Sequence, residues 1–270
     1  VNKMLDYIKE VLENMPTGWL GLTTHRLDIY DEKLAKVQFL EHFEILANEN
    51  NSNFSALNEL PTAFDYIRLG HPLSCVLEWL IAKMNSLSAE GVISFSSKTM
   101  PVLAILRKNL LENKNTQINY TGKLPNYFDI EILRNIYGYK FELSQVHNAS
   151  EISEFKGSNI FISQQDEFSV DLNTNIDFYI NIYANYGSVL LVNGEKNKYY
   201  ISEIQHVRRR ETIAMTPKNC LEVLNFLIKK SSFKTIKVDA AANKMAVLNS
   251  IKEVCNTTTT PLVASSGLSI

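Results

Sequence analysis

The sequence has few cysteines, no long apolar run and almost no net charge, and each of these excludes a class of protein. Its three cysteines, Cys75, Cys220 and Cys255, are scattered and form no Cys-x-x-Cys pair, which disfavours a disulfide framework. No window approaches the apolar length of a membrane span, and the first residues are too polar for a signal peptide. A formal net charge of −2 gives no electrostatic reason to expect nucleic acid as the main partner. We therefore expect a cytoplasmic protein that binds neither membranes nor nucleic acid.

Several catalytic and binding motifs are also missing from the sequence. The five histidines show no pairing at metal-ligand spacing, so we expect no metal site. There is no Gly-x-x-x-x-Gly-Lys or Gly-x-Gly-x-x-Gly loop for phosphates, and no Gly-x-Ser-x-Gly nucleophile elbow. These absences disfavour a P-loop nucleotidase, a dinucleotide-binding enzyme and an α/β-hydrolase.

What is present is the composition of an ordinary globular protein, with 270 residues that are 45% apolar and 21% charged. The pattern along the chain predicts three parts: a helical N-terminal segment at 1–60, an α/β domain at 61–215 and a small C-terminal α/β lobe at 216–270. The outer parts are predicted to contain helices at 2–14, 27–47, 216–230 and 241–254, and strands at 234–238 and 261–270.

Within the middle part, strands and helices are predicted to alternate. The predicted strands are 92–95, 117–120, 141–143, 159–163 and 188–192, and the predicted helices are 100–112, 126–137 and 175–186, the last one closed by Gly187. This alternation implies a mostly parallel sheet with helices on both faces. Ligands in such sheets bind outside the carboxyl ends of the strands, where we expect Ser96, Ser97, Tyr120 and Asn193.

The most specific pattern lies in two stretches, 66–78 and 94–100. In the first, Ser74 can cap a helix whose apolar residues recur at helical spacing. In the second, a short β run stops at Ser96 and Ser97, and a helix begins near Met100. A strand that ends in small hydroxyl residues and leads into a helix N-terminus can hold an anion, because free backbone N–H groups and the helix dipole point the same way.

These two stretches resemble the Cys/Met-metabolism family of pyridoxal-phosphate (PLP) enzymes, which includes cystathionine synthases and lyases. The family pattern is Tyr-x-Arg-x-Gly-Asn-Pro, then Leu-Glu, then Phe-Ser-Ser-Gly-Met, and His71 replaces its Asn here. The other matching positions are Tyr66, Arg68, Gly70, Pro72, Leu77, Glu78, Ala82, Phe95, Ser96 and Ser97. The resemblance implies the fold of the PLP-dependent transferase large domain, although this chain is shorter than the family members.

The resemblance also assigns contacts to the cofactor phosphate. Ser97, Lys98 and Thr99 would form the phosphate cradle, with Lys98 standing where the family has a glycine. A lysine there can neutralise a phosphate, or its bulk can block the cofactor. Tyr66 and Arg68 would reach the same phosphate from a neighbouring subunit, which implies either a dimer with a shared site or only an inherited fold.

PLP chemistry further needs an aromatic over the ring, an acid on the pyridine nitrogen and a lysine for the Schiff base. On the resemblance, Tyr120 would cover the ring; the alternative is a strand-end tyrosine in water. The family's Val-Asp-Asn falls on Leu191-Val192-Asn193, so the acid is missing, although Asn193 remains a candidate contact. Arg210, also a candidate contact, falls at the lysine position, and its guanidinium stays protonated. A rival alignment takes Lys234 as the catalytic lysine.

Three hypotheses about function follow. The first is a degenerate, non-catalytic relative of these enzymes that forms a homodimer or binds a related enzyme through the Tyr66–Arg68 segment. The second is an active PLP-dependent lyase or synthase of sulfur amino acids that uses Lys234 and Tyr120, so the sequence leaves open whether the chain is an enzyme. The third is a protein that binds an anionic small molecule, through phosphate or carboxylate, with Ser97, Lys98 and the arginines at 208–210 beside His206.

Overall fold

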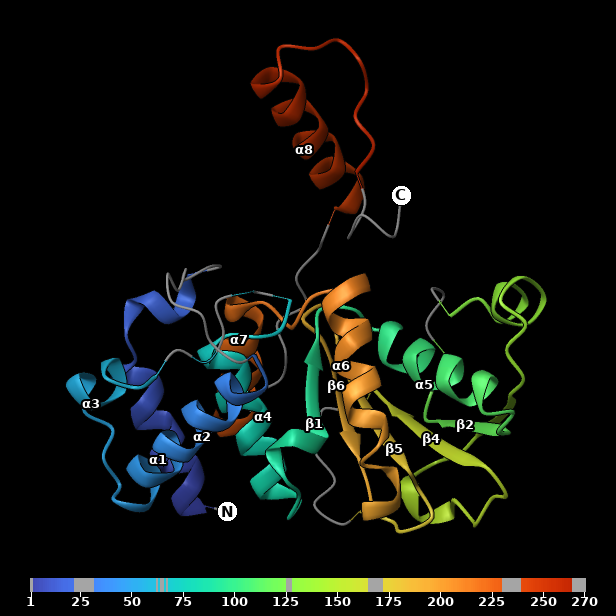
Figure 1. Ribbon diagram of the computed structural model, residues 1–270, viewed down its shortest axis with the longest axis horizontal. Coiled ribbons are helices and arrows are strands. Elements are labelled where there is room, and N and C mark those ends of the chain that lie inside the picture. The colour runs from blue at the N-terminus through green and yellow to red at the C-terminus, as the bar shows by residue number, and fades with distance from the viewer. Residues whose placement is uncertain are drawn as a thin grey trace.

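The computed structural model describes residues 2–21, 32–61, 63, 66, 68–124, 128–164, 172–229 and 239–263. A six-stranded sheet in the order β1-β6-β5-β4-β2-β3 forms its centre (Figure 1). The strands are β1 (Val92–Phe95), β2 (Thr116–Tyr120), β3 (Glu142–Gln145), β4 (Ser158–Ser163), β5 (Phe178–Tyr183) and β6 (Gly187–Val192).

Five strands run in one direction and β6 runs in the other. Strand β2 pairs in parallel with β3 and β4, and β4 pairs in parallel with β5. Strand β6 is antiparallel to both of its neighbours, β1 and β5. The prediction of an α/β fold with a mostly parallel sheet is therefore confirmed.

Helices cover both faces of the sheet, as predicted. One face carries α1 (Asn2–Asn14), α2 (Glu32–Asn48), α3 (Phe54–Asn58), α4 (Pro72–Met84) and α7 (Pro217–Lys229), and the other carries α5 (Met100–Leu111) and α6 (Tyr200–Glu211). Short helical turns are η1 (Thr17–Leu20), η2 (Ala89–Gly91), η3 (Ile132–Ile136), η4 (Ala149–Glu151) and η5 (Glu195–Asn197). Helix α8 (Ala240–Val254) is drawn at the top of Figure 1. None of the described helices is long and apolar enough to cross a membrane.

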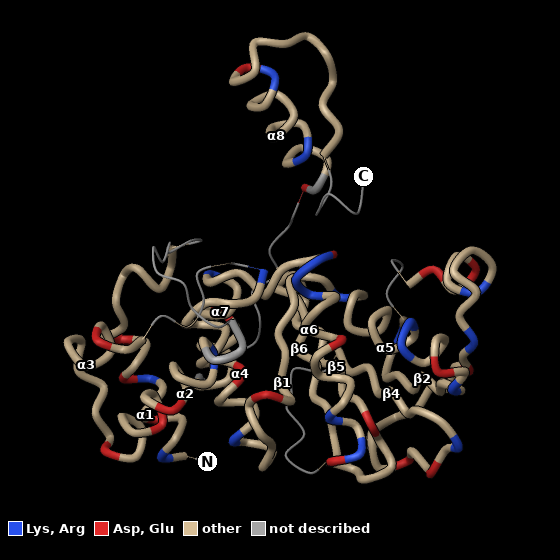
Figure 2. The backbone as a smooth tube through the Cα atoms, in the orientation of Figure 1, with Lys and Arg blue, Asp and Glu red and all other residues tan. Residues whose placement is uncertain are grey.

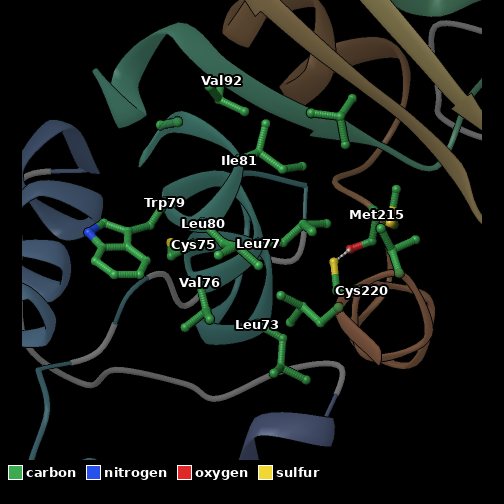
Figure 3. Close-up of a cluster of buried hydrophobic side chains, with 14 of the residues drawn as sticks. Leu73, Cys75, Val76, Leu77, Trp79, Leu80, Ile81, Val92, Met215 and Cys220 are labelled. Carbon is green, nitrogen blue, oxygen red and sulfur yellow. Dashed lines mark hydrogen bonds between the residues drawn. The ribbon is translucent and has the colours of Figure 1, made fainter. Parts of the chain in front are cut away.

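Each face of the sheet has its own hydrophobic core, because successive strand residues point to opposite faces. Val92 belongs to the core under α4, whereas Ile93 belongs to the core under α5 and α6. The larger core joins Tyr7 of α1, Leu77 of α4 and Val223 of α7, so it crosses the boundaries predicted at 60/61 and 215/216. Figure 3 shows its centre, where every residue of α4 from Leu73 to Ala82 is buried.

The predicted helix at 175–186 is wrong. Strand β5 occupies Phe178–Tyr183, and all six of its residues are buried between the two helix layers. A strand that is buried on both faces shows no polar alternation, and this allowed its apolar residues to fit a helical spacing. Gly187 is accordingly the first residue of β6 and not a helix end.

Several other predicted helices and strands differ from the structure, and some lie where no comparison is possible. The predicted helix at 126–137 is reduced, in the described residues, to a helical start at 130–131 and the turn η3. The helix proposed from Ser74 begins earlier: His71 is its N-cap and Ser74 completes a capping box with it. Residues 261–263 belong to no strand. The predicted strand at 234–238, most of the predicted strand at 261–270 and the start of the predicted helix at 27–47 lie outside the described residues.

Candidate functional site

The edge of the sheet where β1 ends is where the sequence predicts a ligand. The carboxyl ends of β1, β2, β4 and β5 meet there, and it includes Ser96, Ser97 and Tyr120 as expected. Asn193 was expected at the same edge, and this is wrong. It follows β6, whose register pairs Leu191 with Val92 at the start of β1, so the antiparallel direction of β6 carries Asn193 to the opposite edge. There its amide donates to the carbonyls of Asn173 (3.1 Å) and Ile176 (2.7 Å).

Ser97 uses its polar atoms to build the start of α5. Its hydroxyl oxygen accepts hydrogen bonds from the backbone N–H groups of Thr99 (3.3 Å) and Met100 (3.1 Å). Its carbonyl oxygen accepts from the hydroxyl of Ser188 at 2.6 Å, which ties the β1–α5 junction to the start of β6. The backbone N–H groups of Thr99 and Met100, which an anion cradle would need as donors, are thus already engaged within the protein.

Lys98 reaches from this junction to the turn between β5 and β6. Its ammonium donates to the side-chain oxygen of Asn185 at 3.3 Å. Desolvation lowers the pKa of Lys98 below its usual value, because partial burial disfavours the charged form. The side chain of Lys98 therefore reaches the β5–β6 turn.

Tyr66 and Arg68 lie beside the end of α6 in the same chain. The Nη1 atom of Arg68 donates to the carbonyls of Arg209 (3.3 Å) and Arg210 (3.5 Å), and the guanidinium lies 5.8 Å from the centre of the Tyr66 ring. Arg68 thus satisfies carbonyls that have no partner within the last turn of a helix. Arg210 itself is exposed on this helical turn, whereas the resemblance places the catalytic lysine after a strand.

Tyr120 lies far along the sheet from Ser97. Three strands, β6, β5 and β4, stand between β1 and β2. Four inter-strand spacings of about 4.8 Å make a separation of roughly 19 Å along the sheet. The structure therefore brings Lys98, next to Ser97, to Asn185 and brings Arg68 to the end of α6, but it does not bring Tyr120 to Ser97.

The described residues do not assemble the PLP contacts that the sequence predicted. The candidate ring-covering tyrosine lies across the sheet, the acid position holds Val192 at the opposite edge, and the hydroxyl of Ser97 is engaged in a helix start. Lys234, the lysine of the rival alignment, lies outside the described residues. No group of three or more potential metal ligands occurs among the described residues either.

A buried ionic cluster is the feature that the sequence analysis missed. Glu78 of α4 accepts from Lys36 of α2 at 2.5 Å and from Arg208 of α6 at 3.0 Å, and it also accepts from the backbone N–H (2.8 Å) and hydroxyl (2.7 Å) of Ser94. Lys36, Glu78 and Arg208 are 6%, 1% and 2% exposed. The available signal was a glutamate inside the otherwise apolar run of α4, because a charge in such a run needs a buried partner.

Further hydrogen bonds complete this cluster. Lys36 donates to the carbonyls of Ala89 (2.7 Å) and Val92 (3.2 Å), and Arg208 donates to the carbonyls of Ser94 (3.2 Å) and Leu69. Desolvation raises the pKa of Glu78, but the two cations and the hydrogen bonds lower it more, so that the pKa lies below its usual value. The cluster fastens α2, α4 and α6 to β1 from both sides of the sheet.

His71 is a buried neutral cap next to this cluster. Its Nδ1 atom accepts from the N–H of Ser74 (3.2 Å), and its Nε2 atom donates to the carbonyl of Met215 (2.7 Å). Desolvation lowers the pKa of His71 to about 4. The same carbonyl accepts from the thiol of Cys220 at 3.4 Å, which Figure 3 shows. His71 thus has a structural role: it connects the start of α4 to the segment before α7.

Comparison with known proteins gives only remote similarities. No protein-family model matches the chain, and no curated protein matches it. Among solved structures, the metB protein of Corynebacterium glutamicum is 14% identical with a TM-score of 0.41, over 63% of this chain and 55% of that one. A cystathionine gamma-lyase from Lactobacillus plantarum, complexed with L-serine, is 12% identical with a TM-score of 0.47, over 90% of this chain and 69% of that one. This chain thus spans little more than half of the first structure, and similarities of this size establish no activity.

Proposed function

We propose that this protein is a non-catalytic relative of the PLP-dependent Cys/Met-metabolism enzymes and that it acts by binding a protein partner, either a second copy of itself or a related enzyme. The observation that carries the proposal is the state of the β1–α5 junction. The backbone N–H groups of Thr99 and Met100 bond to the hydroxyl of Ser97, and the ammonium of Lys98 bonds to Asn185, so these donors are engaged within the same chain. A scaffold whose phosphate cradle is filled by its own side chains suits binding better than cofactor chemistry.

The positions available for a Schiff-base lysine support the same proposal. Arg210, at the position given by the sequence alignment, lies on a helix. Asn185 lies in the turn after β5 at the ligand edge, a position after a strand like that of the lysine in the family motif, and it accepts from Lys98. Neither side chain carries an amine that can form a Schiff base.

The test is a PLP titration followed by absorbance, borohydride reduction and intact-mass analysis. We expect no more fixed cofactor on the folded protein than on the urea-unfolded chain, which measures non-specific reaction with surface lysines. Stoichiometric labelling of one lysine in the folded protein alone would overturn the proposal. Labelling at Lys234 would instead support an active lyase or synthase.

Partner binding has its own test, because Tyr66 is 40% exposed and lies against Arg68. Aromatic and arginine side chains are common energetic centres of interfaces. We expect sedimentation analysis to show a dimer of the free protein whose dissociation constant rises about tenfold in Tyr66→Ala, as loss of an anchoring aromatic predicts. Tyr199→Ala is the matched control, because Tyr199 is 48% exposed and bonds to Glu112 on another surface. A monomer at every concentration would contradict the homodimer.

A further inference from the structure

The edge of the sheet opposite the β1–α5 junction is held together by asparagine side chains. Strands β4 and β5 begin at this edge, and β6 ends there. The side-chain amide nitrogens of Asn159, Asn173, Asn175 and Asn193 donate to backbone carbonyls at 2.7–3.2 Å. This asparagine network ties η4 and the segment before β5 to the start of β4 and the end of β6.

A buried carboxylate, Asp177, lies within the asparagine network just before β5. It accepts from the backbone N–H of Asn159 (2.8 Å) and from the side-chain amide of Asn197 (2.9 Å), and it pairs with Lys196 at 3.0 Å. Figure 2 shows acidic and basic residues side by side in this region, below α6. Asp177 is 4% exposed, so a second carboxylate placed beside it would meet a poorly screened like charge.

Asn193 of this network is followed by Gly194, and the two form the only Asn-Gly pair in the sequence. In such a pair the backbone nitrogen of the glycine can attack the side-chain carbonyl carbon of the asparagine, because glycine has no side chain to obstruct the approach. A new C–N bond closes a succinimide ring, the C–N bond of the side-chain amide breaks, and ammonia leaves with the proton of the backbone nitrogen. Water then opens the ring to give aspartate or isoaspartate.

The fold restrains both of the reacting groups. The side-chain amide of Asn193 donates to the carbonyls of Asn173 (3.1 Å) and Ile176 (2.7 Å), so a rotation of this side chain breaks two hydrogen bonds. The peptide group that contains the nitrogen of Gly194 is restrained as well, because its carbonyl oxygen, that of Asn193, accepts from Asn197 at 2.6 Å. Asn197 is 2% exposed, so water competes little for this hydrogen bond.

We propose that Asn193–Gly194 is a deamidation site that reacts only when the asparagine network opens, and whose products prevent the network from closing again. An aspartate at position 193 has no hydrogen to donate to the two carbonyls, and it adds a negative charge next to Asp177. Isoaspartate lengthens the backbone between β6 and η5 by a carbon atom. The proposal does not depend on PLP or on a protein partner.

The first test compares deamidation of the full chain in its folded state and in urea, at the same pH and temperature. Mass spectrometry of the peptide that contains Asn193 measures the rate. We expect the folded protein to react at least about tenfold more slowly, because only the molecules with an open network can react. Equal rates in the two states, or no reaction of the unfolded chain, would overturn the proposal.

A matched pair of variants tests whether the network is what protects the site. Asn197→Ala releases the peptide group before Gly194, whereas Asn135→Ala removes an exposed amide that bonds to Glu131 elsewhere. In the folded state we expect deamidation to be about fivefold faster in Asn197→Ala, as loss of one hydrogen bond predicts, and to stay within about twofold in Asn135→Ala. In urea both variants should react like the unaltered chain. Equal rates in the two folded variants would overturn the proposal.

The product has a test of its own, which does not depend on the rate of reaction. Asn193→Asp should lower the melting temperature by about 4 °C or more, because two hydrogen bonds are lost and a like charge is added. Asn148→Asp makes the same charge change at an exposed position where the side chain accepts from the N–H of Ser150, so we expect a shift within about 1 °C. An Asn193→Asp protein as stable as Asn148→Asp would overturn the claim that the product keeps the network open.

Discussion

At the scale of single residues, the buried carboxylate of Glu78 joins three segments of the fold. It is the shared acceptor for Lys36, Arg208 and Ser94. The sequence analysis noted Glu78 only as one position of a resemblance and did not find its partners, because Lys36 and Arg208 lie 42 and 130 residues away and no local pattern links them. A local sequence pattern can indicate that a charged residue is buried, but it does not indicate which distant residues pair with it.

Replacing this glutamate tests the cluster. Glu78→Gln keeps the shape of the side chain but leaves two buried cations without a carboxylate, so we expect the free energy of unfolding to fall by about 3–5 kcal/mol. Urea denaturation measures this loss. Glu195→Gln is the control, because Glu195 pairs with Lys198 while 85% exposed, and exposed pairs contribute about 1 kcal/mol at most. Similar losses in the two variants would mean that the buried cluster is not a major source of stability.

His71 gives the protein a predictable dependence on pH. Its pKa is lowered to about 4 in the folded state by burial, against about 6.5 when unfolded. Between these values the unfolded state binds a proton that the folded state does not, so stability falls as the pH decreases from about 6.5 to about 4. The total loss from this residue is roughly 3 kcal/mol, and below about pH 4 it no longer grows.

The variant His71→Asn should remove this slope. Asparagine is a good N-cap and can still accept from Ser74, although the bond to Met215 is lost. We expect a slightly less stable protein at neutral pH and a flatter profile between pH 6.5 and 4, measured by urea denaturation at several pH values. His147→Asn, at an exposed position, should keep the original slope. A full slope in His71→Asn would assign the pH dependence to other groups.

At the scale of elements, the antiparallel strand β6 depends on a glycine at its start. Gly187 has φ +135°, and a Cβ there would lie 2.2 Å from the carbonyl oxygen of Phe95 in β1. Backbone cannot withdraw from such a contact without disturbing the pairing of β1 with β6. We therefore expect Gly187→Ala to lower the free energy of unfolding by roughly 2–4 kcal/mol, measured by urea denaturation.

Gly122 provides the matched comparison for this prediction. It also has a positive φ, +69°, but a Cβ there would meet nothing within 4 Å. Gly122→Ala should therefore cost only the conformational penalty of about 1 kcal/mol. If the two variants lost equal stability, the positive φ alone would explain both losses. The added Cβ at position 187 would then be accommodated by small shifts of β1 and β6.

Elements with a local pattern were predictable from the sequence, and those defined by their surroundings were not. The strand at 92–95 matches β1 to the residue, and α5 ends one residue before the prediction, because turn residues and a proline mark their limits. Strand β5 was missed because it is buried on both faces. The direction of β6 was unknowable from its own residues, and this error carried Asn193 to the wrong edge of the site.

In the candidate site too, features set by neighbouring residues could be predicted from the sequence, and contacts between distant segments could not. The sequence correctly placed Ser96 and Ser97 at the end of a strand before a helix, since both elements are local. It could not show that Lys98 reaches Asn185 or that Arg68 reaches the end of α6, because those contacts join segments 87 and about 140 residues apart.

At the scale of the whole molecule, the sheet and the helices on its two faces form one packed body. Two cores on opposite faces share its strands, and the buried cluster of Glu78 links helices across it. Helix α1 belongs to this body through Tyr7, Ile8 and Val11, which are 3%, 0% and 0% exposed. No described side chain of α8 belongs to either core, although Leu248 is 8% exposed, and Met245 and Val254 are 56% and 86% exposed.

This difference predicts opposite results for two deletions. Removing residues 239–270 should shift the melting temperature by no more than about 3 °C, because a body of this size loses about 2–4 °C per kcal/mol and none of the described side chains at 239–263 belongs to either core. Removing residues 2–14 takes away three buried side chains and exposes the apolar surface that they cover. Each of these side chains is worth about 1.5–3 kcal/mol, so we expect the melting temperature to fall by more than about 10 °C or the chain to become insoluble. Calorimetry of both deletions tests whether the stability of the sheet and its packed helices depends on α8. A large fall in the melting temperature after removing 239–270 would show that α8 packs against the sheet domain in solution.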